Sequence, residues 1–335
     1  MEDRHISLAH GNGGRYMREL IDGIFARHLA NPALDVRLDA APLALAAGFV
    51  PFITTDSFTV QPLEFPGGDI GSLAVNGTIN DLAVSGAVPR FLTLNAIIEE
   101  GLDVACLDRV VKSLAAAAQS GGVCVVAGDT KVVPRGQGGG LYFAATGIGL
   151  RAPDVDLGMK QICEGDVLLV SGPIGDHGIS VMLAREEFEL RGEVISDCAA
   201  VTPLTYPIAA MTGVRFMRDP TRGGLATVAH EIAQATSMNV RLSEQRIPVR
   251  DSVRSVCEML GYDPYYLACE GRVVAVVAPE TATEILAVWH GLACGKDASV
   301  IGEISTGSGR VILTTEIGGE RFLEELEDDP LPRIC

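Results

Sequence analysis

Four aspartates stand beside small residues where the apolar pattern of the sequence predicts that strands or loops end. They are Asp56 after an apolar run, Asp81 in Asn-Asp, Asp129 in Gly-Asp-Thr-Lys and Asp219 in Asp-Pro-Thr-Arg-Gly-Gly. Mg²⁺ takes carboxylate oxygens and substrate phosphates together, so four such aspartates could form one nucleotide–metal site. Taken singly, each is also an ordinary residue of a turn or a helix cap.

The Asn80-Asp81 pair is harder to explain by local structure. Both residues form helices poorly, yet they lie inside a helical pattern of apolar residues at 70–83, where no cap is needed. A functional reason for the pair is therefore favoured.

Two further charged residues are candidates for chemistry. Lys131 follows the strand predicted at 123–127, and it fits either a cation placed against phosphate or a solvated loop lysine. Glu270 directly precedes the apolar strand predicted at 273–277. It is a candidate general base if that strand begins beside a nucleotide cleft, and otherwise an exposed carboxylate.

Two glycine-rich segments, 11–14 and 136–140, are flexible enough to bring backbone N–H groups close to phosphates. Surface loops use the same residues, however, and the sequence contains neither a Walker P-loop nor a dinucleotide-binding fingerprint. His177, in Gly-Asp-His-Gly, is expected at a helix N-terminus, where it either contacts a ligand or belongs to an ordinary turn. Glycine alone does not establish nucleotide binding.

These residues must be positioned by an alternation of strands and helices, which predicts an α/β fold. A polar segment with Pro153 divides the chain into two α/β units, 1–152 and 153–322. The strands are expected at 49–55, 123–127, 141–148, 167–170, 273–277 and 311–314, and the helices at 70–83, 107–118, 179–190, 225–235 and 281–292.

Composition narrows the class of protein. The chain has 335 residues, a net charge of −17 and 47% hydrophobic residues, which excludes disordered and collagen-like classes and argues against a nucleic-acid partner. No uncharged stretch approaches the 20 or so residues of a membrane-spanning helix, and no secretory signal opens the sequence. The cytoplasm is the expected location.

The eight cysteines include no Cys-x-x-Cys pair and mostly lie in apolar runs, so we expect them to be reduced. Cys335 differs because it is the final residue. The segment before it, 324–329, has five carboxylates in six residues and is followed by Pro330 and Pro332. Residues 323–335 are therefore predicted to be a mobile, extended tail, which could reach about 36–40 Å beyond Glu324.

Together these motifs resemble the HypE family of hydrogenase maturation proteins, within the PurM-like superfamily that includes aminoimidazole ribonucleotide synthetase and selenophosphate synthetase. The aspartate motifs are shared with the relatives, whereas a terminal Pro-Arg-Ile-Cys is characteristic of the HypE family. The matching segments are His10-Gly-Asn-Gly-Gly, Thr55-Asp-Ser, Asn80-Asp-Leu-Ala, Ala127-Gly-Asp-Thr-Lys-Val-Val, Gly172 to Gly178, Asp219-Pro-Thr-Arg-Gly-Gly and Pro332-Arg-Ile-Cys.

The resemblance implies a PurM-like two-domain fold, in which the amino-terminal domain pairs across a homodimer to form a β-barrel-like core and ATP binds between the domains. It also implies that the terminal cysteine receives a carbamoyl group from the carbamoyltransferase HypF. ATP-dependent dehydration then gives a thiocyanate, whose cyano group passes to iron on the HypC–HypD complex for nickel–iron hydrogenase.

The resemblance further implies roles for individual residues. Cys335 would be the covalent carrier, Glu270 the base and Lys131 the cation that neutralises the transferred phosphoryl group. Two alternatives stay open: a PurM-like ligase or kinase acting on a free small molecule, and a non-catalytic scaffold switched by nucleotide. The implied ATP contacts are His10, Asn12, Asp56, Asp81, Asp129, Thr130, Lys131 and Asp219, of which the four aspartates would hold Mg²⁺.

Overall fold

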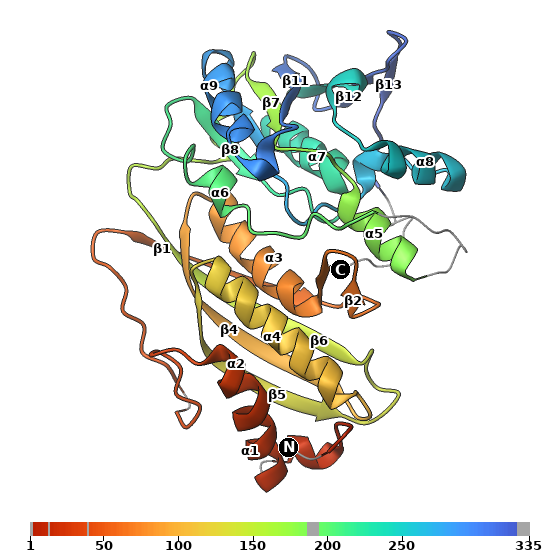
Figure 1. The fold of residues 1–335 in the computed structure, drawn as a ribbon. Coiled ribbons are helices and arrows are strands. Elements are labelled where there is room, and N and C mark those ends of the chain that lie inside the picture. Colours follow the sequence, from red (N-terminus) through yellow and green to blue (C-terminus); the bar gives the residue numbers. More distant parts are fainter. Residues whose placement is uncertain (1–2, 13, 39, 186–193, 327–335) are drawn as a thin grey trace. The chain divides into compact units, whose positions relative to one another are not determined.

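The computed structural model describes residues 3–12, 14–38, 40–185 and 194–326. They fall into two compact units, each built from helices and β-strands, so the predicted α/β class is confirmed (Figure 1). One unit holds the described residues up to Leu82 together with Ala87–Ala152, and the other holds Ala83–Gly86 and the described residues from Pro153 on. Within the described part of the chain, no helix is long and apolar enough to cross a membrane.

The first unit is built on a four-stranded sheet in the order β1-β6-β4-β5. Strands β4 and β5 run parallel, and the other neighbours are antiparallel. Its elements are η1 (Leu8–Gly11), α1 (Arg15–Leu20), η2 (Ile21–Ala26), α2 (Arg27–Leu29), β1 (Val50–Phe58), β2 (Glu64–Phe65), β3 (Gly68–Asp69), α3 (Ile70–Val84), β4 (Val88–Glu99), α4 (Val104–Ser120), β5 (Cys124–Val133) and β6 (Leu141–Arg151).

Helices α3 and α4 cover one face of this sheet (Figure 1). Asp103 caps the N-terminus of α4, since its carboxylate accepts the N–H of Ala105 at 2.8 Å, and the helix buries an apolar stripe against the sheet. Helix α3 lies close to α4 because Gly71 has no side chain: a Cβ there would stand 2.4 Å from the carbonyl oxygen of Val110. The opposite face of the sheet carries exposed side chains, among them Ile53, which is 73% exposed.

The second unit is built on a seven-stranded sheet in the order β13-β12-β9-β11-β7-β10-β8, with only the β9–β12 pair parallel. Its elements are η3 (Met159–Gln161), β7 (Val167–Val170), α5 (Asp176–Ala184), α6 (Thr202–Thr205), β8 (Val214–Arg218), α7 (Gly224–Thr236), β9 (Asn239–Ser243), η4 (Glu244–Arg246), α8 (Asp251–Leu260), η5 (Pro264–Tyr266), β10 (Val274–Val277), α9 (Pro279–His290), η6 (Ala293–Gly295), β11 (Ser299–Ser305), β12 (Val311–Thr314) and β13 (Glu320–Phe322).

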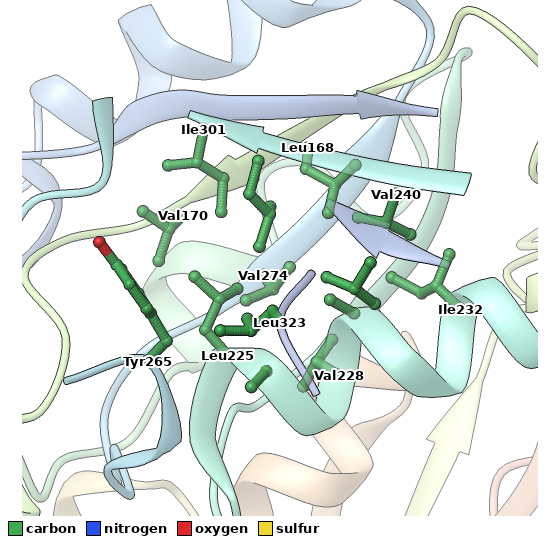
Figure 2. Close-up of a cluster of buried hydrophobic side chains, with 14 of the residues drawn as sticks. Leu168, Val170, Leu225, Val228, Ile232, Val240, Tyr265, Val274, Ile301 and Leu323 are labelled. Atoms are coloured by element: carbon green, nitrogen blue, oxygen red, sulfur yellow. The ribbon is translucent and has the colours of Figure 1, made fainter. Parts of the chain in front are cut away.

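This second sheet is covered on both faces, which explains why β7 and β10 are continuous apolar runs rather than alternating ones. On one face, side chains of α7 such as Leu225 and Ile232 meet Leu168 and Val274 in a single core (Figure 2). On the other face, Leu169 of β7 shares a core with residues of α6 and α9, including the fully buried Trp289.

Several predicted element boundaries are wrong, and three of them concern elements that carry candidate residues. Strand β1 continues to Phe58, so Asp56 lies inside the strand rather than after it. Strand β5 continues to Val133 because it stays paired with β4 as far as Glu99, so Lys131 is a strand residue and not a loop residue. Helix α5 ends at Ala184, short of the predicted residue 190, and part of that prediction lies outside the described residues.

Candidate functional site

Strand β5 presents Asp129 and Lys131 on the exposed face of the first sheet. They are two residues apart, which places their side chains on the same face of a strand. Thr130 between them points the other way and is 7% exposed. Asp129 pairs with Asn95 of β4, which is also exposed. The predicted Asp129-Thr130-Lys131 motif is therefore divided, with its two charged residues on one side of the sheet.

Asp56 and Asp81 lie on the opposite, helix-covered side. The hydroxyl of Thr54 in β1 donates to a carboxylate oxygen of Asp81 in α3 at 2.7 Å. Asp56 follows Thr54 by two residues in the same strand and so shares its face. Both aspartates are partly buried. The structure thus places both aspartates on the helix-covered side of the first sheet.

The sheet separates these two pairs of residues. Strands β1 and β5 are its opposite edges, three inter-strand spacings of about 4.8 Å apart, or roughly 14 Å. Mg²⁺ binds its oxygens at about 2.1 Å, so Asp56 and Asp129 of one copy do not reach the same ion. In the described residues, no three acidic, cysteine or histidine side chains come together as a metal site. Within one copy of the protein, the aspartates of the first unit therefore do not gather around a single magnesium ion.

The two N-terminal candidates differ in accessibility. Gly11 of η1 packs against Val132, which places this turn at the end of β5. His10 is only 1% exposed, and its ring contacts the backbone N–H of Ser7 at 3.1 Å and the carboxylate of Asp3 at 3.4 Å. Asn12, at the end of the turn, is exposed. In this structure His10 stabilises the turn, while Asn12 is open to a ligand.

A cavity of about 490 Å³ runs along β5 within the first unit. Asp129 and Thr130 are among its lining residues, most of which are apolar residue types. That volume lies in the range of small-molecule sites, which are typically apolar with a few polar groups. The apolar walls include Met17, Ile21, Phe25, Leu29, Leu34, Leu94 and Val125.

The glycine segment at 136–140 directs two of its amides at a side chain of the protein rather than at a ligand. The carboxylate of Glu99 accepts the N–H of Gly136 and, at 3.0 Å, the N–H of Gly140. These backbone hydrogen bonds lower the pKa of Glu99 below its usual value. The carboxylate therefore occupies the position that a phosphate would need.

Asp219 and Glu270 lie close together in the second unit. Asp219 begins the turn between β8 and α7, and the carbonyl oxygen of the next residue, Pro220, accepts the N–H of Cys269 at 3.0 Å. Both acids are buried, with Asp219 5% and Glu270 4% exposed. The interpretation of Glu270 as a merely exposed carboxylate is therefore wrong.

Sequence reasoning missed a group of buried charges next to Glu270. Arg272 is 9% exposed, and its guanidinium lies 3.3 Å from the carboxylate of Asp197 and 3.4 Å from that of Asp176. The sequence does contain one clue to this group, because Arg272 directly precedes a strongly apolar strand. A charged residue buried with such a strand is expected to have a partner of opposite charge.

Cys335 lies outside the described residues, but the first residues of the predicted tail do not. Leu323 is 1% exposed and joins the α7 core (Figure 2), and its carbonyl oxygen lies 2.8 Å from His230 Nε2. The carbonyl oxygen of Glu324 accepts the hydroxyl of Tyr266 at 2.6 Å. The prediction of a mobile tail from residue 323 is therefore wrong at its start, because these contacts hold Leu323 and Glu324.

Comparison with known proteins identifies the family. Residues 38–151 match the N-terminal domain of AIR synthase related proteins, and residues 164–314 match the C-terminal domain. Carbamoyl dehydratase HypE of Escherichia coli strain K12 is 44% identical over 336 aligned residues, which cover 99% of each chain. The chain belongs to the HypE family. The family resemblance predicted from the motifs is thereby confirmed.

Solved structures of the HypE family agree with this assignment. A crystal structure of the hydrogenase maturation protein HypE in complex with ATP matches with a TM-score of 0.93 and 42% identity, covering 98% of this chain and 99% of the other. A HypE chain from a HypE–HypF complex matches with a TM-score of 0.80 and 42% identity, covering 92% of this chain and 99% of that one. The predicted PurM-like two-part fold is confirmed, whereas the barrel-like pairing of two copies stays a prediction.

Proposed function

We propose that this chain is an ATP-dependent carbamoyl dehydratase that makes a thiocyanate on its own C-terminal cysteine and supplies the cyanide ligand for the iron of nickel–iron hydrogenase. The observation that carries the proposal is similarity along the whole chain to HypE carbamoyl dehydratase. Cys335 is the cysteine that the family resemblance assigns as the covalent carrier. The structure of a relative with ATP supports the choice of nucleotide.

The reaction needs ATP because hydroxide is a poor leaving group. Transfer of the γ-phosphoryl group to the carboxamide oxygen forms an oxygen–phosphorus bond and releases ADP. The carbon–oxygen bond then breaks with phosphate as the leaving group. The nitrogen gives up both protons as the carbon–nitrogen triple bond forms. The sum converts S-carbamoyl cysteine and ATP to S-cyano cysteine, ADP and phosphate.

Within this scheme, Lys131 neutralises the charge on the transferred phosphoryl group and Glu270 takes a proton from nitrogen. The exposure of Lys131 on an open strand face supports a role in contact with substrate. Cys335 accepts the carbamoyl group through its thiolate, whose ordinary pKa of about 8.5 leaves a minor reactive fraction at neutral pH.

The cavity along β5 is the proposed position of the nucleotide base. The apolar side chains among its lining residues suit an adenine ring. Asp129 and Thr130 line the same cavity, and Asn12 follows the turn that packs against Val132, so these residues are proposed to hold the sugar and phosphates. Mg²⁺ would bind phosphate oxygens and lower the barrier by neutralising their charge. Asp129 is the first-unit carboxylate placed to contribute to it at this edge.

The proposal includes a homodimer. The two pairs, Asp56 with Asp81 and Asp129 with Lys131, are on opposite faces of one sheet, so a second copy is the simplest way to place all four around one nucleotide. Strand β1 is an edge strand, and Ile53 is 73% exposed on it. An exposed edge strand is a template on which a strand of another chain can pair.

Partners and boundaries belong to the same proposal. The complex of a HypE relative with HypF supports HypF as the carbamoyl donor. The HypC–HypD complex is proposed as the acceptor, and the cytoplasm as the location. The proposed domains are 1–152 and 153–322, and the tail that carries Cys335 is proposed to become free only after Glu324.

Intact-mass measurement tests the reaction. Incubation with HypF, carbamoyl phosphate and ATP is expected to add one carbamoyl group to this protein and then to remove one water, with ADP formed in equal amount. The variant Cys335→Ser is expected to gain nothing, while Cys163→Ser, at an exposed cysteine in the second unit, behaves as wild type. Normal adduct formation by Cys335→Ser would refute the carrier role.

Mixed dimers test the composite site. Asp56→Asn and Asp129→Asn are each expected to be inactive alone. Mixing them under conditions of subunit exchange is expected to restore part of the activity, because half of the sites in a mixed dimer then carry neither substitution. No recovery in demonstrably mixed dimers would contradict the shared site.

A further inference from the structure

The chain at Glu270 packs against the segment at 197–199, which is distant from it in the sequence. Its N–H donates to the carboxylate of Asp197 at 3.1 Å, and its carbonyl oxygen accepts the N–H of Ala199 at 3.3 Å. The segments approach so closely that a Cβ on Gly271 would stand 1.9 Å from the carbonyl oxygen of Asp197. Both backbone polar groups of Glu270 are thus fixed by the segment at 197–199.

Asp197 is itself held by a buried cation. Its side chain is 1% exposed, and its second carboxylate oxygen lies 3.3 Å from Nε of Arg272. Burial raises the pKa of Asp197, while the positive charge of Arg272 and the N–H groups of Glu270 and Gly271 oppose that rise. The carboxylate therefore depends on Arg272 for its charge balance.

Arg272 is fixed from the other side by the segment that opens α5. Its Nε donates to the carbonyl oxygen of Pro173 at 2.8 Å, and its terminal nitrogen lies 3.4 Å from Asp176, which also accepts from Arg250 at 3.0 Å. One guanidinium thus links the start of α5 to the segment that holds Glu270. Removal of the cation would release both.

We propose that Asp197 and Arg272 are positioning residues for Glu270, fixing its backbone so that its carboxylate stays aligned for proton removal. The inference rests on the proposed role of Glu270 as the base. Neither residue needs to touch substrate, because Asp197 acts through the main chain of Glu270 and Arg272 acts through Asp197. This assigns a functional purpose to a buried ion cluster that hydrophobic residues could otherwise replace at little cost in stability.

Single-turnover dehydration of the carbamoyl-loaded protein tests this role, with rates and the ATP dependence measured by intact mass. Asp197→Ala is expected to lower the maximal rate 10-fold to 100-fold while the ATP concentration for half-maximal rate changes less than 2-fold. Asp197→Asn, whose amide oxygen still accepts the N–H of Glu270, is expected to lose less. A purely structural role would not produce this ranking at equal folded fraction.

Asp166 supplies the matched control. It is a 3% exposed carboxylate in the same unit, paired with Arg215 at 3.4 Å and accepting the N–H of Cys163 at 2.7 Å. Asp166→Ala is expected to lower the melting temperature as Asp197→Ala does, but to leave the rate of the folded protein within 2-fold of wild type. Equal rate losses in the two variants would overturn the proposal.

Two further outcomes separate this inference from the proposed function. If wild-type protein loses no water on addition of ATP, the proposed function fails. If wild type reacts and Glu270→Gln reacts equally fast while Asp197→Ala is slow, the positioning role is overturned, because Asp197 would then act on another group. A slow Glu270→Gln together with a slow Asp197→Ala supports it.

Discussion

The two units of this protein hold their candidate residues in opposite environments. In the first unit, Asp129 and Lys131 stand on an open strand face, where water surrounds the side chains. In the second unit, Glu270 is 4% exposed, and its N–H donates to Asp197, which is paired with Arg272. The first arrangement leaves charged side chains open to a charged ligand such as a nucleotide. The second fixes the position of one carboxylate before any ligand binds.

This difference teaches how sequence changes act in each unit. An exposed strand residue contributes little to folding, so its replacement changes binding or chemistry alone. A buried ion pair adds little to the free energy of unfolding. Removing one partner lowers that free energy strongly, because the remaining charge is buried without a counter-charge. A substitution at these positions of the first unit is therefore expected to change activity without changing the free energy of unfolding, whereas one in the buried cluster of the second unit is expected to change both.

The largest expected effect is on folding, at Arg272. Arg272→Met leaves Asp197 buried without its cation, and we expect the free energy of unfolding to fall by about 3–5 kcal/mol. Lys131→Met, on the open face, is expected to change it by less than about 0.5 kcal/mol while impairing turnover. Urea unfolding followed by circular dichroism measures both.

A double variant sharpens this contrast. Replacing Asp197 by Asn together with Arg272→Met removes the stranded charge and is expected to recover part of the lost stability. If Lys131→Met proves as destabilising as Arg272→Met, the separation between the two units does not hold.

The parts of this site that the sequence predicts are those governed by local pattern. Asp81 falls inside a helix because apolar residues recur at helical spacing on both sides of it. Asp219 falls in a turn because Pro220 and two glycines follow, and Gly223 and Gly224 do adopt φ of 69° and 58°. In both places, neighbours in the sequence are enough to determine the backbone.

The rest depends on contacts between distant segments. The stretch from Gly128 to Lys131 has the composition of a loop. It is a strand because β4 stays paired with β5 along this stretch and as far as Glu99. The separation of Asp56 from Asp129 follows from the strand order, which periodicity does not reveal. The burial of Glu270 depends on Asp197, 73 residues away.

The second expected effect is pH dependence that originates in the second unit. His177 is fully buried, its Nδ1 lies 2.8 Å from the hydroxyl of Ser196, and burial lowers its pKa from 6.5 to about 3. Between these values the unfolded chain binds a proton that the folded chain does not, so the free energy of unfolding falls as the pH falls. The slope is about 1.4 kcal/mol per pH unit, or about 2 kcal/mol from pH 6.5 to pH 5.

Urea unfolding at pH 7 and pH 5 measures this effect, and His177→Gln shows its origin. The glutamine variant is expected to be less stable at pH 7 but to lose about 2 kcal/mol less than wild type between the two pH values. An unchanged pH dependence in His177→Gln would assign the acid sensitivity to other groups.

The smallest expected effect concerns the root of the tail. Tyr266→Phe removes the hydroxyl that donates to the carbonyl oxygen of Glu324, and we expect a loss of about 0.5–1.5 kcal/mol in the free energy of unfolding. Tyr262→Phe is the control, because its hydroxyl makes no hydrogen bond among the described residues, and it is expected to change little. Since Leu323 stays in the core, carbamoyl transfer to Cys335 should continue in both variants. Faster proteolytic cleavage after Glu324 in Tyr266→Phe alone would locate the start of the predicted mobile tail at this hydrogen bond, and equal cleavage in both variants would contradict that position.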